Sequence, residues 1–139
     1  MKIKNLITLL LTTSFLFSLF GCSEEVHFAD LVERNGFWYK KLAEEPFSGS
    51  VCCETRGKVV KGKREGKWTI WFASGQLSAG AYYNNGELDG LYESYYGNGQ
   101  LSLRGYYKNG SMVGEWGIYN EAGTLDEMPD FDLINEGKN

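Results

Sequence analysis

Apolar and aromatic residues recur along this chain at a fixed step of 24 residues between Gly66 and Gly123. The step is clearest at three sets of positions: Gly66, Gly90 and Gly114; Trp68, Tyr92 and Trp116; and Leu77, Leu101 and Leu125. A fixed period of this length is typical of a repeat array. Each unit contains two short aromatic and β-branched runs separated by turn residues, which predicts a strand, a turn and a second strand. The fold class is therefore expected to be all-β: an antiparallel meander of repeated β-hairpins that forms an open sheet.

Two alternating sets of turns divide the repeat units. Asn85-Gly86 and Asn109-Gly110 favour two-residue type I′ turns, because both central residues of that turn need a positive φ and these residue types tolerate it. Lys61-Gly62 lies 24 residues before Asn85-Gly86 and takes the same place in a shortened first unit. The other set is expected at Ser74-Gly75, Asn98-Gly99 and Ala122-Gly123.

These turns predict a strand register with one apolar face. Two-residue turns give the following cross-strand pairs: Phe72 with Leu77, Ile70 with Ala79, Trp68 with Ala81, Tyr83 with Leu88, Ala79 with Tyr92, Tyr96 with Leu101, Tyr107 with Met112, and Leu103 with Trp116. In the first unit, Thr55 is expected opposite Trp68, and Cys53 opposite Ile70. Directly opposite side chains share a face. Both sets of turns place the apolar residues on the same face, which we expect to be buried.

The opposite face is expected to be polar but to have two rows of aromatic residues. One row contains Trp71, Tyr95 and Tyr119, and the other contains Tyr82 and Tyr106. Glu93 is expected opposite Arg104 on this face, as an exposed ion pair worth about 0.5 kcal/mol. The rings have two interpretations: they brace neighbouring strands, since aromatic residues favour a pleated surface, or they form a binding surface. This choice stays open at the level of sequence.

The first 21 residues have the pattern of a secretory signal. Lys2 and Lys4 provide a positive start, and the apolar run from Leu6 to Phe20 follows. The segment closes as Leu19-Phe20-Gly21-Cys22, which resembles the bacterial lipobox, in which the cysteine is acylated and becomes the mature N-terminus. An ordinary signal peptide is the alternative. This resemblance implies a lipid anchor, such as palmitate, on Cys22 and a place in the bacterial cell envelope, on the outer membrane or facing the periplasm.

The rest of the chain is expected to be one domain with short extensions. The predicted divisions are a signal peptide at 1–21 that forms a helix, a tether at 22–35, a repeat domain at 36–128 and an acidic tail at 129–139. Removal of residues 1–21 takes away Lys2 and Lys4, so 12 basic and 18 acidic residues remain and the net charge becomes about −6. Nucleic-acid binding requires a basic surface, so a nucleic-acid partner is not expected.

Three further residues have chemistry to consider. His27 is the only histidine, and it has no ligand-like spacing to other residues, so no metal and no cofactor are expected. Cys52 and Cys53 are adjacent, and adjacent residues of a strand point to opposite faces. Cys53 is therefore expected inside and Cys52 outside. Either both remain thiols, or Cys52 forms an intermolecular disulfide.

The repeat resembles the bacterial variant of the MORN repeat. Residues 66–86, 90–110 and 114–125 match its units, and 34–39 with 46–49 match its lead-in. Many such chains are labelled as YwqK-family antitoxins. The resemblance implies successive antiparallel hairpins and a role in protein contacts, and it supplies no catalytic residue. Residues 106–114 show a looser likeness to the choline-binding repeats of cell-wall proteins, but the Gly-Trp start of those repeats is missing here.

These observations favour a protein that is not an enzyme. General acid–base catalysis needs titratable groups placed together in a pocket, and the carboxylates fall mainly in turns and in the tail. The leading expectation is a protein-binding or scaffold module, because repeat arrays offer extended faces to partners. The alternatives are binding of cell-wall carbohydrate through the aromatic rows, and an antitoxin of a toxin–antitoxin pair.

Overall fold

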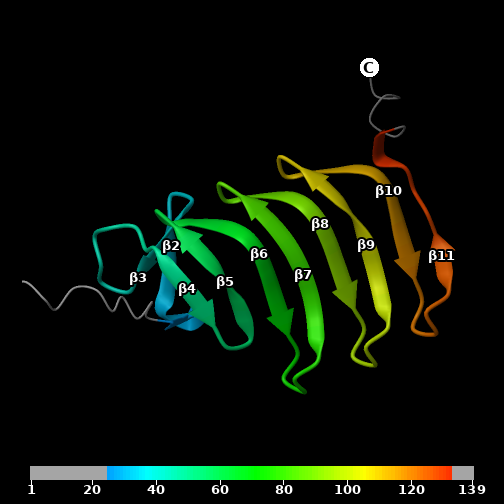
Figure 1. Ribbon diagram of the computed structural model, residues 1–139, viewed down its shortest axis with the longest axis horizontal. Helices are drawn as coiled ribbons and strands as arrows, with labels where there is room; N and C mark the ends of the chain where they lie inside the picture. The colour runs from blue at the N-terminus through cyan, green and yellow to red at the C-terminus, as the bar shows by residue number, and fades with distance from the viewer. Residues whose placement is uncertain (1–24, 133–139) are drawn as a thin grey trace, which may run out of the picture.

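A computed structural model describes residues 25–132 of the 139-residue chain. It confirms the predicted fold class, because strands make up most of these residues and form a large open antiparallel sheet (Figure 1). The elements are β1 (Val26–His27), a 3-10 turn η1 (Phe28–Asp30), β2 (Leu31–Arg34), β3 (Phe37–Lys40), β4 (Gly49–Cys52), β5 (Thr55–Val60), β6 (Lys63–Trp71), β7 (Leu77–Asn84), β8 (Glu87–Tyr95), β9 (Leu101–Lys108), β10 (Ser111–Tyr119) and β11 (Leu125–Glu127).

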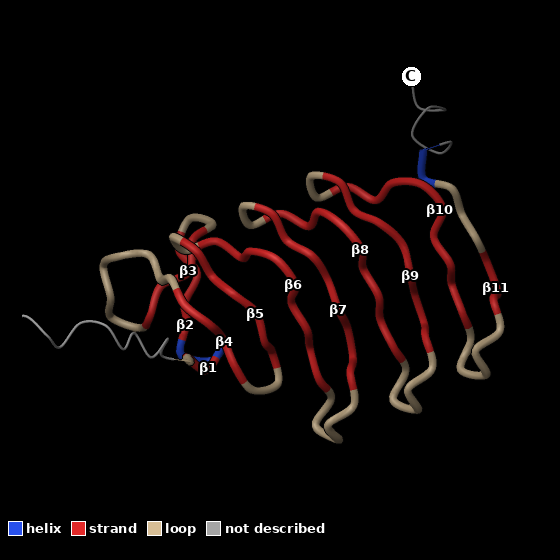
Figure 2. Tube along the Cα trace, viewed as in Figure 1, coloured by secondary structure: helices blue, strands red, loops and turns tan. Residues whose placement is uncertain are grey.

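The main sheet has nine strands in the order β1-β4-β5-β6-β7-β8-β9-β10-β11. From β4 onward each strand pairs antiparallel with the next one in sequence, as a meander requires. The turns alternate between the two ends of the strands (Figure 2). Strand β1 pairs parallel with β4, and β2 and β3 form a separate two-stranded sheet. The predicted signal helix and Cys22 lie outside the described residues.

The structure differs from the sequence prediction between residues 26 and 35. The sequence predicts a polar tether here, but these residues form β1, η1 and β2. The reason is that their apolar side chains find a place in the core: Val26 and Leu31 are buried, and the Phe28 ring packs 6.1 Å from the Trp68 ring. The first predicted strand, at residues 36–39, corresponds to β3.

One set of turns is confirmed as type I′. Residues Asn85 and Gly86 have φ of 52° and 91°, and the equivalent residues 24 positions before and after them are also positive. The strands on either side pair Asn84 with Glu87, so the loop has two residues. Asparagine and glycine occupy these positions because they adopt the left-handed conformation at the least steric cost.

The other set of turns is one residue longer than predicted. Phe72 accepts a hydrogen bond from the backbone N–H of Gly75 and donates its own N–H to the carbonyl of Gln76. Phe72 therefore lies opposite Gln76, and the expected pair of Phe72 with Leu77 is wrong. A β-bulge between Ile70 and Trp71 restores the predicted register, so Ile70 does pair with Ala79. Positive φ at Gly75 allows the extra loop residue.

The same loop recurs one and two repeats later. The hydrogen bonds of Phe72 are repeated at Tyr96 and at Asn120, 24 and 48 positions further along the chain. Tyr96 accordingly lies opposite Gln100, and the expected pair of Tyr96 with Leu101 is wrong because Leu101 pairs with Tyr95. The sequence period is thus a true structural period, down to the individual backbone bonds of the loop.

The repeated glycines Gly66, Gly90 and Gly114 introduce irregularities that the sequence prediction missed. All three have positive φ and lie where the register of their strand shifts by two residues. Four expected pairs are therefore wrong. Ala79 pairs with Ser94 instead of Tyr92, Leu103 pairs with Ile118 instead of Trp116, Thr55 pairs with Ile70 instead of Trp68, and Cys53 pairs with no residue of β6. A shift of two preserves the face of every side chain, so the apolar face survives.

Near each of these register shifts, an aromatic residue of the repeat packs against a small residue of the preceding strand. A Cβ atom built on Gly57 would lie 2.2 Å from the Trp68 ring, and one built on Gly105 would lie 2.1 Å from the Trp116 ring. In the repeat between them, the smaller ring of Tyr92 pairs with Ala81. The indoles therefore lie flat on glycine, and both are buried at 3% and 0% exposure.

The apolar face, called the inner face below, has two buried clusters. The first surrounds Trp68 and includes Val51, Val59 and Phe47 with the residues of β1 and β2. The second surrounds Trp116, which contacts the rings of Tyr92, Tyr107 and Phe131. Their separate covers come from residues 26–47 at one end of the sheet and from residues 129–131 at the other (Figure 1).

The start of the predicted acidic tail is attached to the sheet. The carbonyl of Pro129 accepts a hydrogen bond from the N–H of Trp116, and Asp130 forms a bridge with Glu115. The Phe131 ring then lies 6.0 Å from the Trp116 ring. This segment follows β11 at the end of the sheet and helps to cover the second cluster.

Candidate functional site

Tyr82 and Tyr106 form an exposed row on the outer face, opposite the buried clusters. Their side chains are 42% and 53% exposed. Tyr82 pairs with Lys67, and Tyr106 pairs with Leu91 and with Val113. The two rings are 24 residues apart on β7 and β9, so this row repeats every second strand. Of the aromatic positions predicted from sequence, these two are the most accessible to a ligand.

The second predicted row lies back against its own strands. It contains Trp71, Tyr95 and Tyr119, which are all half-buried. The indole Nε1 of Trp71 donates to Thr69 at 3.2 Å, and the Tyr95 hydroxyl donates to Glu93 at 3.1 Å. Burial, together with the Glu93 carboxylate, raises the pKa of Tyr95. These contacts support bracing of the strand ends.

The outer-face ion pair is present where the register predicts it. Arg104 Nε lies 3.5 Å from the Glu93 carboxylate. A second pair of opposite charges joins Lys108 to Asp89, with Nζ at 3.0 Å from one carboxylate oxygen. The hydrogen bond from Lys108 lowers the pKa of Asp89. The outer face therefore alternates tyrosines with neutralised charge pairs.

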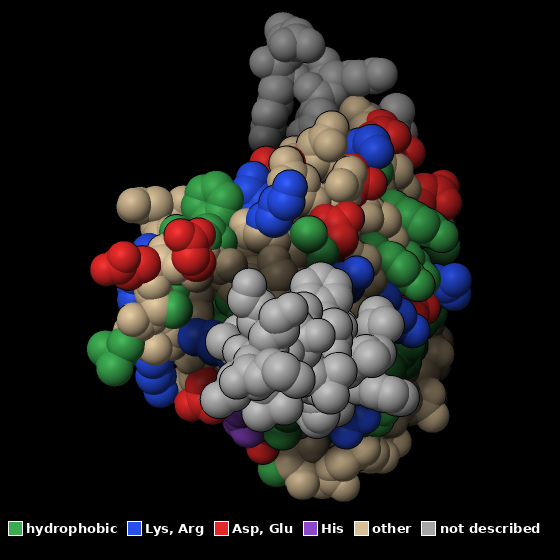
Figure 3. Space-filling model, turned by 60° about the vertical axis from the view of Figure 1, so that its left-hand side comes forward, with side chains coloured by type: hydrophobic (Ala, Val, Ile, Leu, Met, Phe, Trp, Pro, Cys, Tyr) green, Lys and Arg blue, Asp and Glu red, His purple; other side chains and the backbone are tan. Residues whose placement is uncertain are grey.

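Charges are also mixed at the N-terminal end of the molecule. The space-filling view shows lysine and arginine side chains interspersed with aspartate and glutamate, with no large area of one sign on the visible part of this face (Figure 3). The visible part of this face therefore shows no patch of a single sign that would attract a strongly charged ligand.

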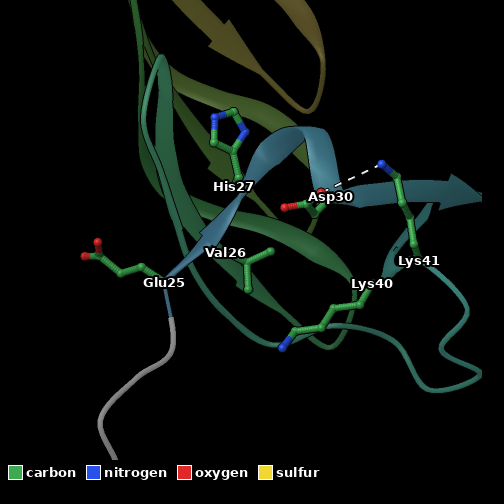
Figure 4. A pocket seen from close by; sticks show the side chains of 6 residues that line it. All are labelled: Glu25, Val26, His27, Asp30, Lys40 and Lys41. Carbon is green, nitrogen blue, oxygen red and sulfur yellow. Dashed lines mark ion pairs between the residues drawn. The ribbon is translucent and has the colours of Figure 1, made fainter.

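An open hollow of about 370 Å³ lies beside β1 (Figure 4). Its lining is Glu25, Val26, His27, Asp30, Lys40 and Lys41, and Lys41 pairs with Asp30 at 3.7 Å. His27 Nδ1 accepts from the N–H of Ala29, so the ring caps η1, and its Nε2 lies 3.6 Å from Glu54. Both ring nitrogens of His27 thus have structural contacts. Within the described range, no cluster of three or more metal-ligating side chains occurs.

Arg64 occupies a cage of aromatic rings on the inner face. Its guanidinium carbon lies 4.9 to 5.3 Å from the ring centres of Phe28, Trp38, Trp68 and Tyr83. One guanidinium nitrogen donates to the Tyr83 hydroxyl at 3.0 Å. The rings come from η1, β3, β6 and β7, so the cation joins the N-terminal segments to the sheet. The chain's own arginine fills the place where a ligand cation would have to bind.

An inner strip runs across the same face, one row away from the tryptophans. We define it as Thr55, Ile70, Ala79, Ser94, Leu103 and Ile118, which are cross-strand neighbours from β5 to β10. Six strands at about 4.8 Å spacing give the strip a length of roughly 24 Å between its ends. Ile70 is 48% exposed, and the others are half-buried. The strip lies between the two covers of the inner face.

An apolar hollow of about 140 Å³ opens at one end of the inner strip. It is lined by Phe28, Thr55, Arg64, Trp68, Ile70, Ala79, Ala81, Tyr83 and Tyr92. Most of these side chains are aromatic or aliphatic, and Arg64 and the Tyr83 hydroxyl add polar groups at its edge. A cavity of about this size accommodates one benzene-sized apolar group. The hollow and the strip together form a mostly apolar site, with Thr55 and Ser94 as the polar members of the strip.

The sequence singled out neither Arg64 nor the exposure of Ile70. The alternation of faces placed Ile70 inside, and an arginine four residues before the buried Trp68 was the available signal for a cation on the same face. Exposure could not be predicted, because it depends on how far residues 26–47 and 129–131 extend over the sheet.

None of the helices in residues 25–132 is long and apolar enough to cross a membrane. Cys22, the predicted lipidation site, lies outside these residues. Comparison with known proteins gave no match among family models, curated proteins or solved structures.

Proposed function

We propose that this chain is a non-enzymatic repeat module that binds a protein partner through the inner strip while a lipid on Cys22 holds it at a membrane of the bacterial envelope. The observation that carries the proposal is the apolar hollow at the exposed Ile70. Exposed apolar surface next to a hollow that can receive a side chain is a feature of protein interaction sites. The resemblance to MORN repeats, which have a role in protein contacts, supports the same class of function.

The chemistry of the hollow favours a particular kind of partner. Its volume fits one aliphatic or aromatic side chain of a partner protein, and the strip beside it fits an apolar ridge about 24 Å long. Buried anchors of this kind dominate the affinity of many interfaces. The strip's side chains have no charged group between Thr55 and Ile118, so charged partner residues would remain outside it.

Site-specific crosslinking in cells tests the interaction. A photoreactive amino acid is placed at Ile70 in the full chain, and the matched control carries it at Leu42, which is 97% exposed but lies in the β3–β4 loop. We expect a discrete, protease-sensitive adduct from position 70 and none from position 42. Adding Ala79→Arg, which fills the hollow with a charge, should abolish the adduct while the thermal melting of the protein stays close to that of the parent.

Absence of an adduct at position 70 in intact cells would refute the protein-binding proposal. The anchor is tested separately, by lipid labelling and fractionation of the wild type and Cys22→Ala. We expect label and membrane association only in the wild type. A chain that takes no label and remains inside the cell would refute the envelope location and favour the antitoxin alternative.

Cell-wall carbohydrate binding is the second candidate, and the exposure of Tyr82 and Tyr106 favours it. Flat rings on a pleated face can stack against sugar rings. Retention of the wild-type chain on isolated wall material, with loss of retention in the Tyr82→Ala/Tyr106→Ala double variant, would support it. Equal recovery of both chains on wall material and on an inert control resin would exclude this mode.

A further inference from the structure

The turn between β4 and β5 brings two consecutive cysteines together. Cys52 ends β4 and Cys53 is the first residue of the turn. Their Sγ atoms lie 2.7 Å apart, and both residues are half-buried. A disulfide has a sulfur–sulfur length of about 2.05 Å, so the folded turn holds the two thiols within about 0.7 Å of bonding distance. The prediction that Cys53 points inside, to the opposite face from Cys52, is therefore wrong, whereas Cys52 follows the buried Val51 and points away from the core as predicted.

The backbone of the turn explains this approach. In a regular strand, adjacent side chains point to opposite faces. Cys53 instead has a φ of 81°, in the left-handed region that residues other than glycine adopt uncommonly. This conformation rotates the Cys53 side chain back toward Cys52. The turn thus removes the geometric obstacle that a continuous strand would have presented to a bond between the two sulfurs.

Contacts on both sides hold the turn in place. Arg56 Nε donates to the Cys53 carbonyl at 3.3 Å. On the other side, Cys52 pairs with His27 of the parallel strand β1, and His27 Nε2 approaches the Glu54 carboxylate at 3.6 Å. The positions of the two cysteines therefore depend on the folded N-terminal segment as well as on the turn itself.

A small reagent has room to reach the pair. A hollow of about 340 Å³ lies next to Cys53 and also includes Arg56, Trp71 and Phe72 in its lining. The Arg56 guanidinium lies 5.4 Å from the centre of the Trp71 ring, so a cation faces this hollow. The hydrogen bond to Cys52 raises the pKa of Cys53 to about 11. Cys53 is therefore a thiol at neutral pH, which slows uncatalysed exchange because the thiolate is the attacking species.

We propose that Cys52 and Cys53 form an intramolecular redox site, in which the folded turn converts two thiols into a disulfide between adjacent residues by exchange with a low-molecular-weight disulfide such as glutathione disulfide. One thiol attacks the reagent and releases the first reduced thiol, and the second cysteine then attacks the mixed disulfide and releases another. Overall, two protein thiols and one small disulfide give one protein disulfide and two small thiols. The two electrons lost by the cysteines reduce the reagent. This site is independent of the inner strip.

Peptide mapping measures the reaction. The full chain carries Cys22→Ala, so Cys52 and Cys53 are its only cysteines. The protein is equilibrated with reduced and oxidised glutathione, quenched with acid, alkylated and digested with trypsin, which leaves both cysteines in peptide 42–56. We expect this peptide to be lighter by two hydrogen atoms than the reduced peptide and to remain unalkylated. The protein should run as a monomer on a non-reducing gel.

A comparison of folded and unfolded protein separates the effect of the fold from simple adjacency. The same equilibration in concentrated urea should lower the equilibrium constant for forming the Cys52–Cys53 disulfide by about tenfold. The reason is that fixing one residue's backbone costs a free energy of this order. Cys53→Ser is the matched control and should show only a glutathione adduct or a dimer at Cys52. The proposal would be overturned if the parent chain gave mainly dimers or doubly alkylated peptide. It would also be overturned if the Cys52–Cys53 disulfide formed equally well in urea.

Discussion

Replacement of Gly105 by alanine tests the packing that the repeat imposes. A Cβ atom at this position would lie 2.1 Å from Trp116, whereas ordinary contacts begin at 3.4 Å. The indole and the strand must therefore separate by about 1.3 Å. The ring has little freedom to move, because it is fully buried against the rings of Tyr92, Tyr107 and Phe131. Overpacking in a core typically costs about 1–3 kcal/mol, and this site belongs at the upper end.

We expect Gly105→Ala to lower the free energy of unfolding by about 3 kcal/mol and the melting temperature by roughly 10–15 °C. Urea and thermal denaturation of the full chain, followed by tryptophan fluorescence and circular dichroism, measure both quantities. Gly97→Ala is the matched control. Gly97 lies in an exposed loop, has no atoms within 4 Å of a built Cβ and has no positive φ, so its replacement should change stability by less than about 0.5 kcal/mol.

The repeat itself suggests a rescue. Its central unit combines Ala81 with Tyr92 where the flanking units combine glycine with tryptophan. Adding Trp116→Tyr to Gly105→Ala recreates the central pair. Trp116→Tyr alone should cost about 2 kcal/mol, and the double variant should be at least about 1 kcal/mol more stable than the sum of the single effects predicts. Simple additivity, or a Gly105→Ala variant as stable as Gly97→Ala, would refute this account of the packing.

Three further substitutions test the cage, a turn and a charge pair. Arg64→Met should lower the free energy of unfolding by about 2 kcal/mol, because the cation contacts four rings. Lys67→Met, on the outer face, is the control. Equal denaturant midpoints for the two variants would contradict the role of the cage. Asn85→Ala should cost about 1 kcal/mol, because φ is 52° there, while Asn85→Gly should stay within about 0.5 kcal/mol. Asp89 has a pKa lowered from 3.8 by Lys108, so its contribution to stability is present above pH 3.8 and is lost as pH falls through the lowered value. Asp89→Asn should therefore reduce the acid dependence of the melting temperature below about pH 4, and an unchanged pH profile would argue against the pair.

Local rules were sufficient to predict most of the sheet. Asn85-Gly86 and its equivalents identified the type I′ turns, since few other residue pairs tolerate two positive φ values. The alternation of side chains then identified the inner face. The bulges at Gly66, Gly90 and Gly114 were missed, because an isolated glycine in a strand does not state how far the register shifts. The predicted face of each side chain was nevertheless right, since each shift of the strand register was by two residues.

The candidate sites were less predictable. Trp71, Tyr95 and Tyr82 all appeared equivalent as outer-face aromatics, yet only Tyr82 among them is strongly exposed. The difference arises from hydrogen bonds to neighbours on the same strand, at Thr69 and Glu93, which spacing alone does not reveal. The contact between Cys52 and Cys53 was likewise hidden, because it depends on a left-handed residue at a position where the sequence predicted a strand.

The sequence by itself determined the period, the strand order from β4 onward and the division into two faces, because turns and alternation act over a few neighbouring residues. Only the tertiary structure decided which part of the inner face is covered. The side chains of Val26, Phe28 and Leu31 pack in the cluster around Trp68, although the sequence predicts a polar tether for their segment. Phe131 covers Trp116 from the other end of the chain. These contacts join residues about 15 to 40 positions apart, and their burial depends on the shape of the surface that the folded sheet presents to them.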